Sequence, residues 1–294
     1  MLRNQTVMVA GGCNLSCTYC WYEVGSSVYG AEGVSAAEYD RWFAASAALE
    51  PLESIAVTGG EPLLRADVGD ILAVAHAHCG QVSVFTNGTL LKPGLVQDMA
   101  HLGTQVHVSV DHVDLSIADR VRGGTKASLA SLDLLSEGGV RTVQICMVVT
   151  SRNWTQVGAM AQLARDRGFH LELIPVGVPD VHPLSLRTLT EAERAALAGE
   201  LAAHADLLGR RLYYNRIAGY LATGRLAKSP ACRAGDTGVF INSEGDVTVC
   251  GQRLDVRLGN IRTTPPEQVA AAKKRETDRR PPGRCVSLDC AVLV

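Results

Sequence analysis

The sequence predicts an α/β fold: a parallel barrel of six strand and helix units, followed by a small C-terminal domain. Strand-like and helix-like segments alternate from the start of the chain to about residue 180. Polar motifs follow the ends of several of these strands, as they do at the mouth of a barrel. Apolar residues make up 47% of the 294 residues, which is enough to fill a barrel core.

The first half of the barrel carries clear local signals. A short apolar strand is expected at 6–9, directly before a cysteine-rich loop. Ser35 and Glu38 form a capping box for a helix that ends near residue 49, before Pro51. A strand is expected at 54–58, a helix at 67–78, a strand at 82–85 and a helix from Pro93 onward.

The second half of the barrel continues the alternation. We expect a strand at 106–110, a helix at 126–136, a strand at 143–149, a helix at 154–167 and a strand at 170–175. Parallel strands joined by helices bring their carboxyl ends to one edge, where barrels hold their active sites. Two more helices are expected at 190–208 and 214–223, the first capped by Thr190 and Glu193.

The C-terminal region has a different pattern. Two short strands, at 239–242 and 245–250, are joined by a Ser-Glu-Gly-Asp turn and predict a β-hairpin. Four cysteines flank or follow it, namely Cys232, Cys250, Cys285 and Cys290. We therefore divide the chain into a barrel at 1–180, a helical connector at 181–231 and a cysteine-rich domain at 232–294.

Composition excludes several classes of protein. The 28 basic and 30 acidic side chains nearly balance, and no basic stripe predicts nucleic-acid binding. No apolar run approaches the ~20 residues that span a bilayer, so no membrane segment is expected. Nine cysteines in a chain without a secretory leader favour a reducing cytoplasm over a disulfide framework.

The most informative motif is the spacing C-x3-C-x2-C of Cys13, Cys17 and Cys20. Three thiolates on one short loop can bind three irons of a [4Fe-4S] cluster and leave the fourth iron open to another ligand. The alternative is structural zinc, which normally takes four ligands in two pairs. A fourth ligand that would complete a second pair is not evident near Cys20.

Together with Gly59-Gly60-Glu61-Pro62, the triplet resembles the radical S-adenosylmethionine (radical SAM) superfamily. The resemblance implies a partial (β/α)6 barrel of the TIM type and a SAM molecule bound at the open iron. It also implies an external electron donor, flavodoxin or ferredoxin, whose electron allows SAM to be cleaved to a 5'-deoxyadenosyl radical. That radical abstracts hydrogen from the substrate.

The residues expected at the SAM site lie in the barrel motifs. Gly59 and Gly60 allow close backbone approach, and Glu61 offers a carboxylate to an ammonium group. Ser109 and Asp111 share one strand face, and the resemblance sets them near the SAM carboxylate and ribose. The alternative is an ordinary strand end at Ser109 followed by a turn residue at Asp111. The remaining cofactor-binding candidates are Tyr19 in the cysteine loop, Pro62, Asn87, Thr150, and Arg122, which is otherwise a solvated loop arginine.

The C-terminal cysteines carry a second resemblance. The spacing C-x12-G-x4-C, from Cys232 through Gly245 to Cys250, is similar to the opening of SPASM and twitch domains. A full SPASM domain uses seven cysteines for two clusters, and here four remain. The resemblance therefore implies a twitch domain with one auxiliary [4Fe-4S] cluster, held by Cys232, Cys250, Cys285 and Cys290, and two clusters in all. A zinc site is the alternative.

Two residues are candidate catalytic groups. Cys146 shares a strand face with Gln144 and Val148, so its thiol is a candidate hydrogen donor to a substrate radical, or else a packed core cysteine. Glu172 is a candidate substrate anchor or base. Weaker candidates are Tyr22, Tyr29 and Glu32, and Cys79 is expected to be structural.

An auxiliary cluster whose irons all have protein ligands is suited to electron transfer. We therefore expect dehydrogenation of a small natural product, such as a sugar, aminocyclitol or nucleoside, and the architecture resembles twitch-bearing aminocyclitol dehydrogenases. Epimerisation, decarboxylation and maturation of a ribosomal peptide stay open. Only twelve residues precede Cys13, which disfavours a leader-binding module and so the peptide alternative. A simple electron carrier would not need the Gly-Gly-Glu segment.

Overall fold

The computed structural model describes residues 2–20, 33–114, 121–208, 211–223, 237–251 and 253–279. Within them, one sheet of nine strands runs in the order β6-β5-β4-β3-β2-β1-β7-β8-β9. The strands are β1 (Asn4–Ala10), β2 (Ser54–Gly59), β3 (Val82–Thr86), β4 (Gln105–Ser109), β5 (Val143–Val149), β6 (His170–Pro175), β7 (Gly238–Ile241), β8 (Asp246–Thr248) and β9 (Arg257–Asn260).

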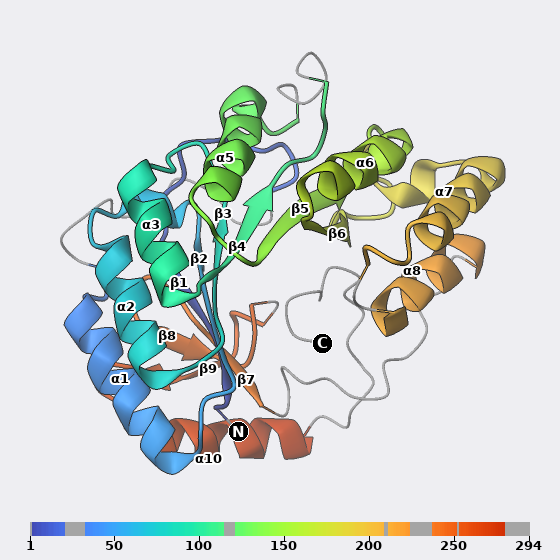
Figure 1. Cartoon of the computed structure of the whole chain (residues 1–294). Helices are drawn as coiled ribbons and strands as arrows, with labels where there is room; N and C mark the ends of the chain where they lie inside the picture. Colours follow the sequence, from blue (N-terminus) through green and yellow to red (C-terminus); the bar gives the residue numbers. More distant parts are fainter. Residues whose placement is uncertain are drawn as a thin grey trace.

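Helices follow the strands of the barrel in turn. The α-helices are α1 (Ala36–Leu49), α2 (Val68–His78), α3 (Pro93–Leu102), α5 (Thr125–Glu137), α6 (Val157–Arg167), α7 (Glu191–Ala203), α8 (Arg211–Thr223) and α10 (Pro266–Arg279). Short 3-10 turns occur at Pro62–Leu64, Trp154–Gln156 and Leu186–Thr188. Figure 1 shows α1, α2, α3 and α5 covering one face of the curved sheet.

The six barrel strands are all parallel, as the sequence predicts. Alternate residues of these strands pack under the helices, among them Val106, Val108, Ile145 and Met147, all fully buried. Because successive side chains of a strand point to opposite faces, the intervening residues lie on the inner, concave face of the sheet. The partial-barrel α/β architecture predicted from the sequence is thus confirmed.

The C-terminal hairpin joins this sheet directly. β7 pairs in parallel with β1, with Val7 opposite Ile241, and β8 and β9 follow as antiparallel strands. The hairpin was expected, whereas its pairing with β1 was not. The division of the chain at residues 180 and 231 stays a prediction, since the segment 224–236 lies outside the described residues.

One expected helix end is wrong. The helix predicted to reach residue 208 ends at Ala203, because the chain turns over the next residues before α8 packs against α7. Its predicted capping box forms, and so does that of α1: the side chain of Glu38 accepts from the backbone of Ser35. Glu38 also accepts a 2.7 Å hydrogen bond from Nε of Arg262, which ties α1 to the segment after β9.

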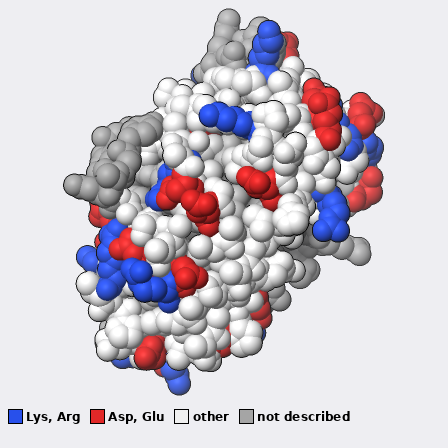
Figure 2. All heavy atoms as spheres, turned by 60° about the vertical axis from the view of Figure 1, so that its left-hand side comes forward, with Lys and Arg blue, Asp and Glu red and all other residues white. Residues whose placement is uncertain are grey.

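The surface is mixed in charge on the face that Figure 2 displays, where basic and acidic side chains lie beside one another. Among the helices in the described part of the chain, none has the length and apolar character needed to cross a membrane.

Candidate functional site

The cysteine loop, which follows β1 and holds Cys13, Cys17 and Cys20, packs against the end of β2. The backbone N–H of Gly60 donates to the carbonyl of Ala10 at 2.7 Å, and that of Glu61 donates to the carbonyl of Gly12 at 2.8 Å. A Cβ atom at Gly60 would lie 2.2 Å from the Gly12 oxygen, so no larger residue fits there. The two glycines of the Gly-Gly-Glu segment therefore allow this loop to pack closely against β2.

The three thiols of the loop lie close enough to influence one another. Burial raises the pKa of the Cys13 and Cys17 thiols, and the charge of Cys20 adds to this rise in both. Cys20 is exposed, and its backbone N–H donates to the Cys17 carbonyl at 3.0 Å in a tight turn. Three neighbouring thiol donors, one of them exposed, fit a [4Fe-4S] cluster with one open iron.

Glu61 is fully buried, and its carboxylate is held by protein donors. Oε1 accepts from the Thr86 hydroxyl at 2.7 Å and from the Leu63 backbone at 3.0 Å. Oε2 accepts from the Asn87 backbone at 2.7 Å. Burial raises the pKa of Glu61, and these three hydrogen bonds oppose the rise. The carboxylate thus fixes the turn after β3 beneath the loop.

Asn87 extends this contact to the cysteine loop itself. Its Nδ2 donates to Oδ1 of Asn14 at 2.9 Å and lies 3.9 Å from the Cys13 sulfur. Its Oδ1 accepts from the backbone and hydroxyl of Thr89. Gly88 follows with a φ of +76°, a conformation that favours glycine in this turn.

A second buried group anchors the other side of the loop. Oδ2 of Asp111 accepts from the Tyr19 hydroxyl and, at 2.9 Å, from Nε of Arg122, while Oδ1 accepts from the Val148 backbone at 2.9 Å. The Arg122 guanidinium also lies 5.6 Å from the centre of the Tyr19 ring. The backbone N–H of Thr18 donates to the Val121 carbonyl at 2.9 Å, so the loop also contacts the residue just before Arg122.

Thr150 is fully buried, and a nearby asparagine binds it. Oδ1 of Asn153 accepts from its backbone at 2.7 Å and from its hydroxyl at 3.0 Å. Nδ2 of Asn153 donates to the carbonyls of Val148 and Asp111, so this residue joins the ends of β4 and β5. Asn153 was not predicted from the sequence: an asparagine just before a helix is a typical capping residue, but its side chain binds Thr150 and does not cap the helix.

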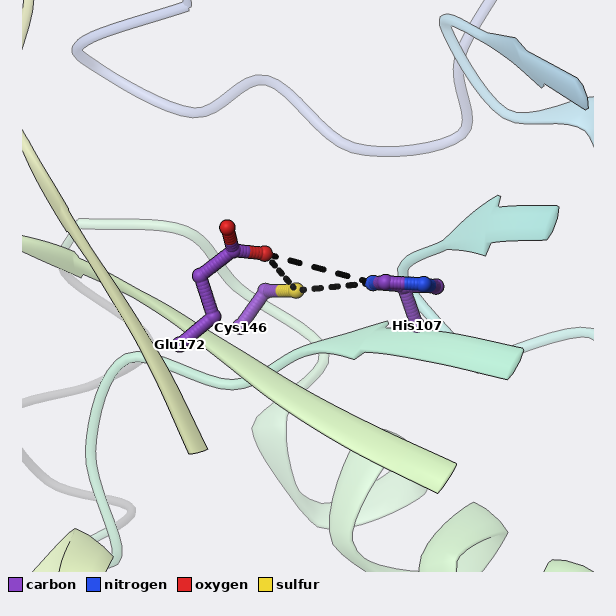
Figure 3. A group of neighbouring side chains, drawn as sticks. All are labelled: His107, Cys146 and Glu172. Atoms are coloured by element: carbon purple, nitrogen blue, oxygen red, sulfur yellow. Dashed lines mark hydrogen bonds and ion pairs between the residues drawn. The ribbon is translucent and has the colours of Figure 1, made fainter. Parts of the chain in front are cut away.

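On the inner face, three buried side chains from neighbouring strands point toward one another (Figure 3). Cys146 on β5 lies opposite Ser109 on β4 and Glu172 on β6. The Cys146 sulfur is 3.6 Å from Oε2 of Glu172 and 3.8 Å from Nδ1 of His107. The structure therefore brings together the two predicted catalytic candidates. His107 was missed, although it shares the strand face of Ser109.

The remaining candidate residues lie away from this group or outside the described part of the chain. Cys79 is buried at the end of α2 and contacts the carbonyls of Leu52 and Gln81, as expected of a structural cysteine. Cys250 is half-buried and follows β8. The residues that lie outside the described part of the chain are Tyr22, Tyr29, Glu32, Cys232, Cys285 and Cys290.

Comparison with known families agrees with this site. The family model of the radical SAM superfamily matches residues 7–164, more than half of the chain, and the SPASM model, an iron-sulfur cluster-binding domain, matches residues 232–291. The chain therefore belongs to the radical SAM superfamily. An enzyme with this pair of domains uses S-adenosylmethionine and [4Fe-4S] clusters, which are the cofactors of this chain.

Curated relatives are moderately similar. The probable GTP 3',8-cyclase of Aeropyrum pernix is 30% identical over 62% of this chain and 52% of its own length. The mycofactocin maturase MftC of Mycolicibacterium smegmatis is 30% identical over 66% and 51%. The AdoMet-dependent heme synthase of Methanosarcina barkeri is 28% identical over 87% and 78%. The chain thus spans about half the length of the first two of these relatives.

Solved structures share the fold. Native anSMEcpe with bound AdoMet and Cp18Cys peptide superimposes with a TM-score of 0.71 at 20% identity, over 94% of this chain and 82% of that chain. SuiB of Streptococcus suis, bound to S-adenosylmethionine, gives a TM-score of 0.72 at 16% identity, over 91% and 65%.

Proposed function

We propose that this radical SAM enzyme oxidises its substrate by two electrons on the inner face of the barrel, between two clusters. The first cluster is assigned to Cys13, Cys17 and Cys20, and the second to Cys232, Cys250, Cys285 and Cys290. The observation that carries the proposal is the position of Cys250. β8 runs antiparallel to β1, so the two strands end at opposite edges of the sheet. Cys250, just after β8, therefore lies at the edge opposite the cysteine loop.

A substrate on the inner face of β4 to β6 would lie between these two edges of the sheet. When bound, SAM and the first cluster supply a 5'-deoxyadenosyl radical that takes one hydrogen atom, and the second cluster supplies an acceptor for one electron. The substrate also releases one proton, so it loses two hydrogens in total. Ser109, Cys146 and Glu172 offer polar groups on this face to hold and orient a polar substrate.

We assign SAM to the carboxyl edge of the barrel strands, beside Gly59, Gly60, Glu61, Pro62, Asn87 and Ser109. Glu61 and Asn87 also bind protein groups, and they would shape the turn beside SAM. Three further predicted SAM residues have protein partners that support a positioning role. Asp111 accepts hydrogen bonds from Tyr19, from Arg122 and from the backbone of Val148. The hydroxyl and backbone N–H of Thr150 both donate to Asn153. Tyr19, which donates to Asp111, would then be held in place against SAM rather than free to move.

A small molecule is our first candidate for the substrate. The heme synthase supports this candidate. The match covers 87% of the present chain, and the name of that relative indicates a small-molecule product. A peptide is the second candidate. MftC is called a maturase, and SkfB of Bacillus subtilis, 27% identical over 55% of this chain, is called a maturation protein.

Formation of 5'-deoxyadenosine separates the two substrate classes. The reduced holoenzyme would be incubated with SAM and an extract of its native cells, before and after the extract has been digested with a broad-specificity protease. A small-molecule substrate predicts that the extract stimulates 5'-deoxyadenosine formation equally after digestion. Loss of stimulation after digestion would move the assignment to a peptide.

The role of Cys250 has its own test. In Cys250→Ala the first cysteine set is unchanged, so SAM cleavage should continue while the oxidised product is lost. Cys79→Ala serves as the matched control, because it removes a cysteine from neither proposed set. Full product formation by Cys250→Ala would contradict the proposed electron acceptor.

An external donor, flavodoxin or ferredoxin, is proposed to reduce the enzyme.

A further inference from the structure

We propose that His107, Cys146 and Glu172 bind a divalent transition-metal cation of the zinc type on the inner face of the barrel. The three residues come from β4, β5 and β6, and none belongs to the two cysteine sets assigned to clusters. Each is at most 6% exposed, so the group is part of the interior. Binding of the ion does not depend on the proposed oxidation.

The spacing of the three donor atoms carries the proposal. The Cys146 sulfur lies 3.6 Å from Oε2 of Glu172 and 3.8 Å from Nδ1 of His107, and the latter two atoms are 4.0 Å apart. A triangle with these edges has a centre about 2.2 Å from every corner, within the range of zinc bonds to sulfur, nitrogen and oxygen. A direct hydrogen bond from imidazole to carboxylate would be much shorter than 4.0 Å.

The chemistry of the donor set agrees with such an ion. Thiolate, imidazole and carboxylate together are ligands that zinc accepts, whereas calcium and magnesium take oxygen ligands. Deprotonated Cys146 and Glu172 would place two negative charges side by side in the interior. Like charges that lie close together repel each other, and a dication between them would offset both charges.

Neighbouring residues orient two of the three ligands. Nε2 of Gln144 donates to Oε2 of Glu172 at 2.8 Å. The His107 ring is stacked on Phe85, with ring centroids 4.2 Å apart and planes inclined by 24°. Hydrogen bonds to ligating groups regularly fix their orientation in metal sites, and the stacked ring restrains the plane of the imidazole. Gln144 and Phe85 are therefore positioning residues for the proposed ion.

Three protein ligands leave one position of a four-coordinate site open, as in catalytic zinc sites. An oxygen or nitrogen atom of the substrate is the ligand we assign to that position, so Cys146 and Glu172 would hold the substrate through the ion and not by direct contact. A metal-bound hydroxyl group loses its proton more readily than a free one. This last step rests on the proposed function, because it would aid release of the proton that oxidation requires.

Zinc retention by the holoenzyme tests the site without turnover. The protein with both clusters loaded would be incubated anaerobically with Zn²⁺ and desalted, and its zinc and iron would be measured separately. We expect about one zinc per chain for a single site of this type. Cys146→Ser and Glu172→Gln should lose it with iron unchanged. Cys79→Ser should retain it, because that buried cysteine lies in another part of the barrel.

X-ray absorption at the zinc edge identifies the ligands. The proposed site predicts one sulfur, with nitrogen and oxygen completing the first shell. A shell of three or four sulfurs would mean that zinc occupies a cluster site, and it would overturn the proposal. So would the absence of retained zinc in the wild type, or full retention in Cys146→Ser. Unchanged iron in the variants shows that they are folded, so every outcome is informative.

Discussion

Asp111 accepts a 2.9 Å hydrogen bond from Nε of Arg122, and this ion pair is nearly excluded from solvent. The same carboxylate accepts from the Tyr19 hydroxyl, inside the cysteine loop, and from the backbone of Val148 on β5. One buried charge pair thus connects the loop after β1 with strands at the other side of the barrel. Burial and the charge of Asp111 raise the pKa of Tyr19 well above its usual value, against the opposing charge of Arg122, so its hydroxyl remains a donor.

We predict that Asp111→Asn destabilises the protein strongly. The change leaves the Arg122 guanidinium buried without its counter-charge, which typically costs about 3–5 kcal/mol. The free energy of unfolding from a urea titration measures this cost. The double variant Asp111→Asn with Arg122→Met should recover much of it. Equal destabilisation of the single and double variants would show that the ion pair is not the cause.

Local signals predicted the parts of the fold that neighbouring residues determine. Ser35 with Glu38, and Thr190 with Glu193, form the expected capping boxes because each pair lies within one helical turn. The pairing of β7 with β1 was not predicted, since it joins segments more than 200 residues apart in the chain. Strand pairing at that separation leaves no local pattern.

The candidate site shows the same difference between local signals and contacts that are distant in the sequence. The spacing of Cys13, Cys17 and Cys20 lies within eight residues, so the sequence displays it directly. The partners of Glu61 are different: Thr86 and Asn87 lie 25 and 26 residues away and are brought under it by the sheet. His107 could have been found from its strand face. Its contact with Glu172, across two strand pairings, needed the structure.

Gly60→Ala tests the contact between β2 and the cysteine loop. The added methyl group would lie 2.2 Å from the Gly12 carbonyl oxygen and 3.0 Å from the Cys13 nitrogen, so the loop backbone must move. Overpacking of this kind costs about 1–3 kcal/mol. We expect the reconstituted variant to lose the iron of its first cluster. Gly94→Ala is the control, because its Cβ would have no neighbour within 4 Å.

Glu61→Gln tests the three hydrogen bonds that the Glu61 carboxylate accepts, two of which come from Thr86 and Asn87 at the end of β3. The amide group of glutamine would point a donor at one of the three donors from Leu63, Thr86 and Asn87. A buried group left unpaired costs about 1–3 kcal/mol. We predict lower stability and weaker SAM binding, measured by denaturation and calorimetry. Wild-type SAM affinity in this variant would show that the turn does not shape the SAM site.

The ion pair of Glu38 with Arg262 predicts a pH dependence. The hydrogen bond from Arg262 holds the pKa of Glu38 at about 2, below its usual 4.5. Because the folded-state pKa is lowered, the stabilisation is complete above pH 4.5 and disappears as the pH falls toward 2.

Unfolding of wild type and Arg262→Ala at several pH values measures this effect. We expect a difference of roughly 0.5–1 kcal/mol at neutral pH, typical of a partly exposed pair, that shrinks in acid. Arg41→Ala is the matched control, since Arg41 is an exposed residue of the same helix α1. A difference for Arg262→Ala that stays constant into acid would contradict the assignment to Glu38.

The mass of the product formed in deuterated water tests the central claim most directly. The holoenzyme would be turned over with SAM, reductant and its substrate, and the product would be compared with the substrate by mass spectrometry. Two-electron oxidation predicts a product lighter by two hydrogens, with one SAM consumed per product. A product heavier by one mass unit, with solvent deuterium on the attacked carbon, would contradict oxidation and indicate inversion by hydrogen return.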